Sequence, residues 1–269
     1  MDNINPIFIL QPILVIIFSS ALMVYWYKKR RFHKNIWLYT LIAYAGAIAL
    51  KYAVQLPTIN LVLGAGPAAL GVYYGGVQTI VFEVGLAYAL AYFAVKRGKL
   101  DQRDGEAYGS GLAFWENVGL ISVLSLINLI SYYFLISGGG LTAELVYGTL
   151  AESAPALFSS NAEALSFVAL GTVERISSAM LHIAWGYLCF MAVIHKNKKL
   201  FLIALPMGFV DFLVPFAGDS IVLFEVGLFL LASASLFVAW YTTKQLRKKT
   251  PPTPETPTTL TIDAPKESS

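Results

Sequence analysis

The stretch Leu165–Ile194, LSFVALGTVERISSAMLHIAWGYLCFMAVI, decides the fold of this protein. Most of it is apolar or small, but Glu174, Arg175 and His182 lie inside it. A helix rises about 1.5 Å per residue, so this run is long enough to cross the roughly 30 Å hydrocarbon core of a bilayer. It therefore predicts a membrane-spanning helix that carries three ionisable side chains.

Further apolar runs of this length recur along the 269-residue chain, of which 57% is hydrophobic and 13% charged. Backbone polar groups in lipid must be satisfied within the chain, so such runs favour helices. The predicted fold is an all-α, polytopic membrane helix bundle of about seven transmembrane helices. The predicted spans are Ile7–Tyr27, Ile36–Leu56, Ala69–Val95, Leu112–Ile136, Leu165–Ile194, Leu200–Ala217 and Ser220–Thr243.

Basic residues predict the orientation. Most of the 19 Lys and Arg residues follow the first, third, fifth or seventh span, in segments 28–34, 96–103, 196–199 and 244–249. The loops on the opposite side, 57–67, 137–164 and 218–219, contain neither residue type. The positive-inside rule then places the N-terminus outside and the C-terminus in the cytoplasm of a multi-pass cell-membrane protein. The net charge of +3 reflects this orientation, so we expect membrane lipids and no nucleic acid as partners.

Two regions are expected to lie apart from the spans. Residues 1–246 are predicted to form the seven-helix transmembrane domain, and residues 247–269, rich in Pro and Thr, a disordered cytoplasmic tail. The outer loop 137–164 is long enough to hold a short re-entrant or surface helix.

Four ionisable residues are predicted to lie deep in the membrane. Counted at about 1.5 Å per residue from the cytoplasmic end of each span, Glu83, His182 and Asp211 come to about 18–20 Å. Glu116 comes to about 12 Å, within reach of the same layer if its span tilts. An ionisable residue at such depth costs about 2.5–3.5 kcal/mol on insertion scales, which makes each one a candidate functional residue.

A second group, consisting of Lys51, Glu174, Arg175 and Glu225, is predicted nearer the outer surface, at about 24–30 Å. We expect Glu174 and Arg175 to pair with Glu225 and Lys51 and so to close the outer end of the bundle through charge-assisted hydrogen bonds.

The fifth span is predicted to present a polar stripe. His182 follows Arg175 by seven residues and shares its helix face, and Ser178 lies close to that face. Carboxylates and an imidazole that meet in a low-dielectric layer cannot all stay charged and unpaired. Such a cluster is typical of a water-activating catalytic site, of an ion or proton pathway, or of a metal held for structure.

Four segments carry these polar residues in order. They are IVFEVGLAYALAYFAVKRGK (80–99), YGSGLAFWENVG (108–119), ERISSAMLHIAWGY (174–187) and ALPMGFVDF (204–212). Together they resemble the YhfC family of glutamic or metallo-type intramembrane peptidases, which are distantly related to the type II CAAX prenyl endopeptidases. The most specific feature is Glu174-Arg175 followed by His182. The resemblance implies peptide-bond hydrolysis in the membrane, with a transmembrane or lipidated peptide as substrate.

This chain departs from the family pattern. The family's Glu-Glu pair reads Glu83-Val84, and the arginine expected after it is Ala87. The histidines expected in the Gly-rich and last segments are Leu112 and Met207. The chain is therefore predicted to be a divergent member.

The sequence does not decide whether the protein binds a metal cofactor. A divalent metal ion agrees with the resemblance, but zinc ligation by two histidines within the membrane is not available, because His33 and His195 lie in predicted cytoplasmic turns.

The candidate catalytic residues are Glu83, Glu116, His182 and Asp211, and the candidate binding residues are Glu174 and Arg175. In a peptidase, Glu83 or Glu116 is the base that activates water. His182 orients the water or stabilises the oxyanion, Asp211 holds the imidazole, and Arg175 binds a carbonyl or carboxylate. Two other functions stay open: a proton- or cation-coupled transporter or channel, and a non-catalytic scaffold that binds a membrane segment.

Overall fold

The computed structural model describes residues 3–216 and 220–249, with side chains placed up to residue 246. Its helical elements are η1 (Pro6–Ile9), α1 (Leu10–Arg30), α2 (Asn35–Leu63), α3 (Pro67–Leu70), η2 (Gly71–Val77), η3 (Thr79–Val84), α4 (Gly85–Lys96), η4 (Gln102–Asp104), α5 (Gly105–Phe114), η5 (Trp115–Ser122), α6 (Val123–Ser137), α7 (Gly140–Ser153), η6 (Pro155–Phe158), α8 (Asn161–Ile194), α9 (Lys198–Gly208), η7 (Phe209–Phe216) and α10 (Ile221–Lys249).

Within these described ranges, seven helices are long and apolar enough to cross a membrane, which confirms the predicted fold. They are Pro6–Arg30, Asn35–Leu63, Pro67–Lys96, Gln102–Ser137, Asn161–Ile194, Lys198–Phe216 and Ile221–Leu246.

Two predicted boundaries are wrong. The second span continues through Pro57 to Leu63, beyond the predicted end at Leu56. A proline is tolerated in a transmembrane helix because neighbouring helices and side chains satisfy the backbone groups that it frees. The fourth span begins at Gln102 and not at Leu112. Its glycine-rich start is helical because the small residues allow close packing against α8.

Helix α8, which contains the stretch Leu165–Ile194, is the centre of the bundle. It packs against α1, α4, α5, α9 and α10, and about two thirds of its most apolar window is buried. Its start is capped reciprocally: the Ser160 hydroxyl accepts from the Glu163 backbone N–H, and the Glu163 carboxylate accepts from the Ser160 N–H.

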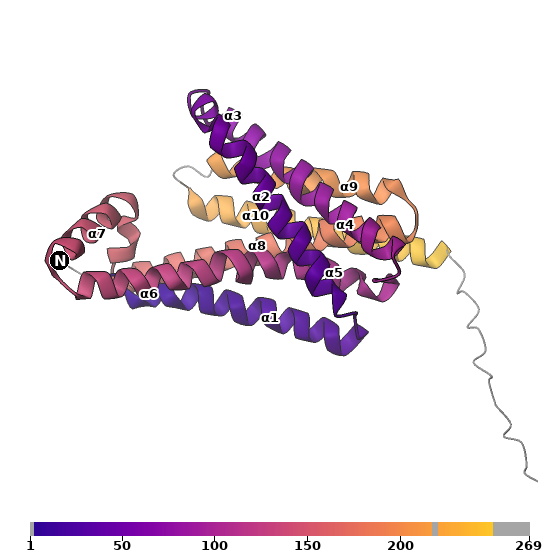
Figure 1. The fold of residues 1–269 in the computed structure, drawn as a ribbon, viewed down its shortest axis with the longest axis horizontal. Coiled ribbons are helices and arrows are strands. Elements are labelled where there is room, and N and C mark those ends of the chain that lie inside the picture. The colour runs from indigo at the N-terminus through magenta and orange to yellow at the C-terminus, as the bar shows by residue number, and fades with distance from the viewer. Residues whose placement is uncertain (1–2, 217–219, 250–269) are drawn as a thin grey trace, which may run out of the picture.

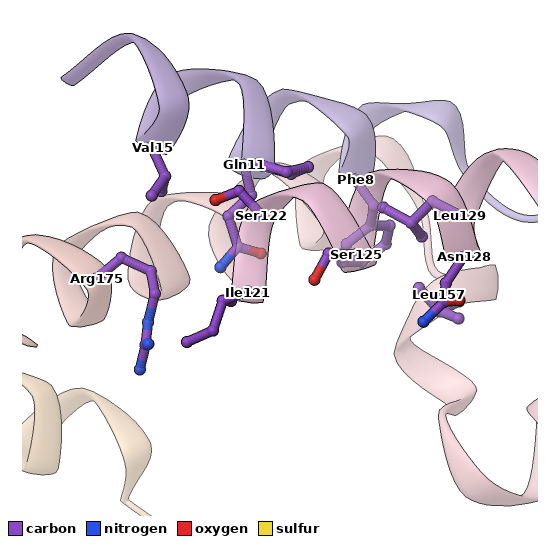
Figure 2. A pocket seen from close by; sticks show the side chains of 11 residues that line it. Phe8, Gln11, Val15, Ile121, Ser122, Ser125, Asn128, Leu129, Leu157 and Arg175 are labelled. Carbon is purple, nitrogen blue, oxygen red and sulfur yellow. The ribbon is translucent and has the colours of Figure 1, made fainter. Parts of the chain in front are cut away.

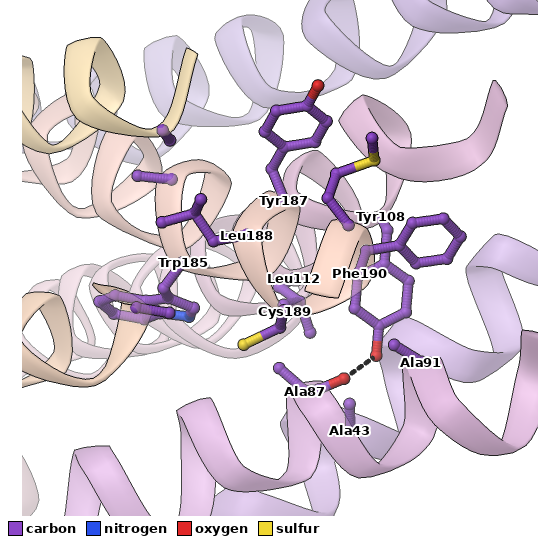
Figure 3. Close-up of a cluster of buried hydrophobic side chains, with 14 of the residues drawn as sticks. Ala43, Ala87, Ala91, Tyr108, Leu112, Trp185, Tyr187, Leu188, Cys189 and Phe190 are labelled. Atoms are coloured by element: carbon purple, nitrogen blue, oxygen red, sulfur yellow. Dashed lines mark hydrogen bonds between the residues drawn. The ribbon is translucent and has the colours of Figure 1, made fainter. Parts of the chain in front are cut away.

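The tightest helix crossing lies between α5 and α8. A Cβ atom on Gly109 would lie 2.5 Å from the carbonyl oxygen of Ile183, and one on Gly186 would lie 2.7 Å from the Gly109 Cα. Next to this crossing, Tyr108 donates a 2.7 Å hydrogen bond to the carbonyl oxygen of Ala87 on α4, within the main hydrophobic cluster (Figure 3). The crossing fixes the register between α8 and the span that contains α5 and η5.

The loops gather at two ends of the bundle (Figure 1). At one end, Arg30 forms an ion pair with Glu106 at 2.7 Å, and Asp104 accepts from His33 Nδ1 at 2.8 Å. These contacts join the end of α1 and the α1–α2 connection to the start of the fourth span, within the basic segments 28–34 and 96–103 and next to them. The other end holds the N-terminal segment and α7.

The short helix expected in loop 137–164 is present as α7. The terminal orientation stays a prediction. The predicted tail falls almost wholly on residues 250–269, which lie outside the described residues, and the helix α10 continues past the expected domain end at residue 246 to Lys249.

Candidate active site

His182 lies between two glutamates from different spans. Its Nε2 atom is 3.0 Å from Oε2 of Glu83, and its Nδ1 atom is 2.9 Å from Oε2 of Glu116. The Nδ1 atom is also 3.0 Å from the carbonyl oxygen of Ser178. The imidazole side chain is only 5% exposed. Since an ionised carboxylate only accepts hydrogen bonds, both contacts are satisfied when both ring nitrogens carry protons or when one carboxyl group does.

The second oxygen of Glu83 accepts from the ammonium group of Lys51 on α2. Lys51 also donates to the Thr79 hydroxyl at 2.8 Å, and Thr79 donates to Oδ2 of Asp211 at 2.6 Å. Glu83, Lys51, Thr79 and Asp211 therefore form one hydrogen-bonded chain that ends at the His182 imidazole.

Glu116 is held by three partners on α8. In addition to His182, the Ser178 hydroxyl donates to its Oε2 atom at 2.7 Å, and Arg175 Nη1 lies 3.4 Å from its Oε1 atom. Arg175 also pairs with its neighbour Glu174. The backbone carbonyl of Arg175 accepts from the Asn117 amide at 3.1 Å, which ties η5 to α8 a second time.

Both glutamates lie in π-helical segments, Glu83 in η3 and Glu116 in η5. A π turn bonds residue i to i+5, so it rotates the following side chains relative to a regular α-helix, and such turns occur often at functional sites. The segment before η3 is held tightly: a Cβ atom on Gly71 would lie 2.5 Å from the carbonyl oxygen of Phe212 in η7.

Two aromatic rings flank the imidazole. The Trp185 ring centroid is 4.3 Å from that of His182, and the Tyr44 ring lies edge-on at 6.0 Å. Packing against these rings limits the rotation of the imidazole.

A cavity of about 250 Å³ opens beside the imidazole, between α8, η7 and α10. The segment η7 belongs to the sixth span, and α10 is the seventh. Both spans pack on α8 and make little contact with one another. The polar side chains in its wall are Glu116, Glu174, Arg175, Ser178, His182, Asp211 and Glu225. Glu225 is 5% exposed, and its Oε2 atom has no hydrogen-bond partner among the described residues. Glu83 does not line this cavity.

A second cavity, also of about 250 Å³, reaches Arg175 from the side of α1 and α6 (Figure 2). Its wall carries Gln11, Ser122, Ser125 and Asn128. Arg175 lies at one end of this group in the figure, and it also lines the first cavity. Arg175 therefore borders both spaces.

The model of the YhfC intramembrane metalloprotease family matches residues 9–215. The chain belongs to this family. Comparison with curated proteins and with solved structures found no match. The match to YhfC includes every residue of the cluster around His182 and ends before α10, so Glu225 lies outside it. The expected kinship with the type II CAAX endopeptidases stays a prediction.

The name of the YhfC family implies a metal ion, and the cluster around His182 does not fit one. Both nitrogens of the imidazole already face carboxylates, and both oxygens of Glu83 face cationic or imidazole partners. The cations Lys51 and Arg175 already lie against Glu83 and Glu116. A zinc ligand must present a free lone pair, so these contacts would have to be broken.

Among the described residues, the one group of three that meets the distances of a metal site is His33, Asp101 and Asp104. It lies at the end of the bundle, away from His182, and its Asp104 carboxylate is engaged by the backbone N–H groups of His33 and Asp101. These contacts join the α1–α2 connection to the loop before the fourth span.

The structure brings together Glu83, Glu116 and His182, as the sequence predicted. The predicted contact between Asp211 and the imidazole is wrong: Asp211 lies in the same cavity wall, but its hydrogen bond goes to Thr79. Asp211 lies in the 3₁₀-helical segment η7, which follows the end of α9 at Gly208, so its side chain does not have the direction that a regular α-helix would give it.

The predicted pairing among the four outer charged residues is also wrong. Lys51 contacts Glu83 and not Glu174 or Arg175. The depth count placed the Cα atoms of Lys51 and Glu83 only about 4 Å apart along the membrane normal. A lysine side chain is long enough to cover that difference. Arg175 pairs with Glu174 and Glu116, and Glu225 stays without a partner for its Oε2 atom among the described residues.

Sequence reasoning missed Thr79 as a member of the cluster. Its position four residues before Glu83 was a usable signal, because residues at that spacing share a helix face. Trp185 and Tyr44 had no comparable signal, since both belong to apolar runs in which aromatic residues are common.

Proposed function

We propose that this protein hydrolyses peptide bonds of transmembrane segments at the cluster formed by Glu116, His182 and Arg175. The observation that carries this proposal is the cavity between η7 and α10, which exposes these three side chains to a gap between two spans. A substrate helix in the lipid can reach the cluster through that gap.

The roles follow from which groups face the cavity. Glu116 takes a proton from water, and the resulting hydroxide attacks the carbonyl carbon of the substrate. Arg175 lies against Glu116 and stabilises the negative charge that develops on the carbonyl oxygen. The imidazolium form of His182 donates a proton to the departing amide nitrogen. Glu83 is a positioning residue, because it holds Nε2 of His182 from outside the cavity wall.

Water needs its own route to such a site. The second cavity supplies one in this proposal, because Gln11, Ser122, Ser125 and Asn128 line it with hydrogen-bonding groups up to Arg175 (Figure 2). Water would enter past Arg175, and the substrate would enter from the opposite side of α8.

The test is the set of new protein N-termini in membranes of cells that express the protein. We expect N-termini within transmembrane segments of other proteins in cells with the wild type, and their loss with Glu116→Gln at equal protein yield. The matched control is Glu144→Gln, which changes an exposed glutamate on α7. Equal sets of N-termini with the wild type and with Glu116→Gln would contradict hydrolysis at this site.

A second function is favoured by the poor fit of the cluster to a metal ion. In this alternative, the protein binds a transmembrane segment in the cavity and does not cleave it. It predicts that a photoreactive amino acid placed at Phe224, in the cavity wall, is cross-linked to a membrane protein, while the set of N-termini stays the same with and without expression.

A further inference from the structure

A lysine lies in the middle of this cluster, in α2, with 13% of its side chain exposed. A buried ammonium group loses hydration that oxygen acceptors must replace. Lys51 finds two such acceptors, the Glu83 carboxylate and the Thr79 hydroxyl. Its carbon chain cannot reach the cytoplasmic or outer surface without leaving them.

One neighbouring span supplies both oxygens that this ammonium group contacts, and a second span is connected to them. Glu83 and Thr79 come from η3, while Asp211 of η7 is connected to it through the Thr79 hydroxyl. The acids Glu83 and Asp211 would repel one another without a cation between their spans. The ammonium group therefore performs the electrostatic task of a bound cation: it joins acidic groups that would otherwise separate.

A divalent ion near Glu83 would need the same oxygens. It would also lie next to a fixed positive charge, and the two cations would repel one another. We propose that Lys51 is the built-in cation of this site, and that the wild-type protein binds no divalent metal ion there. This inference concerns the assembly of the site and holds whether or not the protein is a peptidase.

The experiment compares Lys51→Ala with Lys51→Met in purified protein. Alanine removes the charge and opens space beside Glu83, whereas methionine removes the charge and fills the space. We expect both variants to melt at a lower temperature than the wild type. Addition of ZnCl₂ should restore most of the loss in Lys51→Ala, because binding to the folded state stabilises it, and little of the loss in Lys51→Met.

Three controls make the comparison specific. Metal analysis of His33→Ala, which removes a ligand of the other donor group, should give well under one divalent ion per chain, and EDTA should leave the melting temperature of that variant unchanged. Lys199→Ala removes a charge at an exposed position and should respond to ZnCl₂ as the wild type does. The donor group at His33 is present in the wild type and in all three lysine variants, so any zinc binding there cancels in the comparison.

Each remaining outcome overturns the proposal. One divalent ion per chain that remains bound in His33→Ala, together with a lower melting temperature of that variant in EDTA, shows a metal site beside Lys51. An equal zinc response of Lys51→Ala and the wild type shows that Lys51 does not occupy a cation site. If Lys51→Ala does not fold without metal, its yield during expression with and without added zinc replaces the melting temperature as the measurement.

Discussion

Glu83 is tolerated deep in the bundle because both of its oxygens are engaged, one by Lys51 and the other by His182. The removal of one member of a buried charge pair leaves the other without compensation, which costs about 3–5 kcal/mol. The same holds for Glu116, whose contacts with His182, Ser178 and Arg175 come from a single helix face.

His182→Ala should therefore lower the stability of the protein by about 3–5 kcal/mol, because it leaves two buried carboxylates without the imidazole. The measurement is the melting temperature in detergent. Ser166→Ala, at an exposed position on the same helix, is the control and should have little effect. An unchanged melting temperature in His182→Ala would show that the imidazole does not hold the spans together.

Glu225 should behave in the opposite way. Its Oε2 atom is buried without a partner among the described residues, and an unsatisfied buried polar group costs about 1–3 kcal/mol. Glu225→Leu should keep or raise the melting temperature, whereas substitution of a paired carboxylate should lower it. A clear loss of stability in Glu225→Leu would reveal a structural partner for this group.

At the scale of elements, the crossing of α5 and α8 sets the position of the site. Glu116 follows α5 directly, and His182 lies one turn before Gly186 on α8. Because Gly109 and Gly186 let the backbones meet, any side chain there would push η5 away from α8 and separate Glu116 from His182.

Gly109→Ala is expected to lower the melting temperature and to reduce any cleavage activity, since the added Cβ atom meets the backbone of Ile183. The matched control is Gly148→Ala in α7, where a Cβ atom meets nothing within 4 Å. That control should be neutral or stabilising by about 0.5–1 kcal/mol, as is usual for Gly to Ala in a helix. Equal effects of the two substitutions would contradict a tight crossing.

At the scale of the whole molecule, the orientation in the membrane can be tested with cysteine labelling. The native Cys189 is fully buried and should not react with a membrane-impermeant maleimide. If the N-terminus is outside, Thr142→Cys should react in intact cells, while Lys99→Cys should react only after the membrane is opened. The reverse pattern would show the opposite orientation.

Helix content, the seven spans and the family were available from the sequence. The run around Glu174 and His182 predicted a span because its length matches the bilayer, and the matching segments pointed to YhfC. These properties depend on hydrophobicity summed over about twenty residues and on short local patterns, both of which are written along the chain.

Pairing within the site was predicted only in part. The depth count placed Glu83 and His182 in one layer and Glu116 slightly lower but within side-chain reach, and both glutamates do contact the imidazole. The same count assigned Lys51 to another layer and gave Asp211 to the imidazole, since it locates Cα atoms along the membrane normal and says nothing about side-chain reach or helix rotation.

The sequence by itself determined that this protein is a bundle of membrane-crossing helices with acids and a histidine inside it. Only the tertiary structure decided which of these groups touch. The physical reason is that π turns and glycine crossings set the rotation of each helix, and rotation decides whether a side chain meets a partner or the lipid.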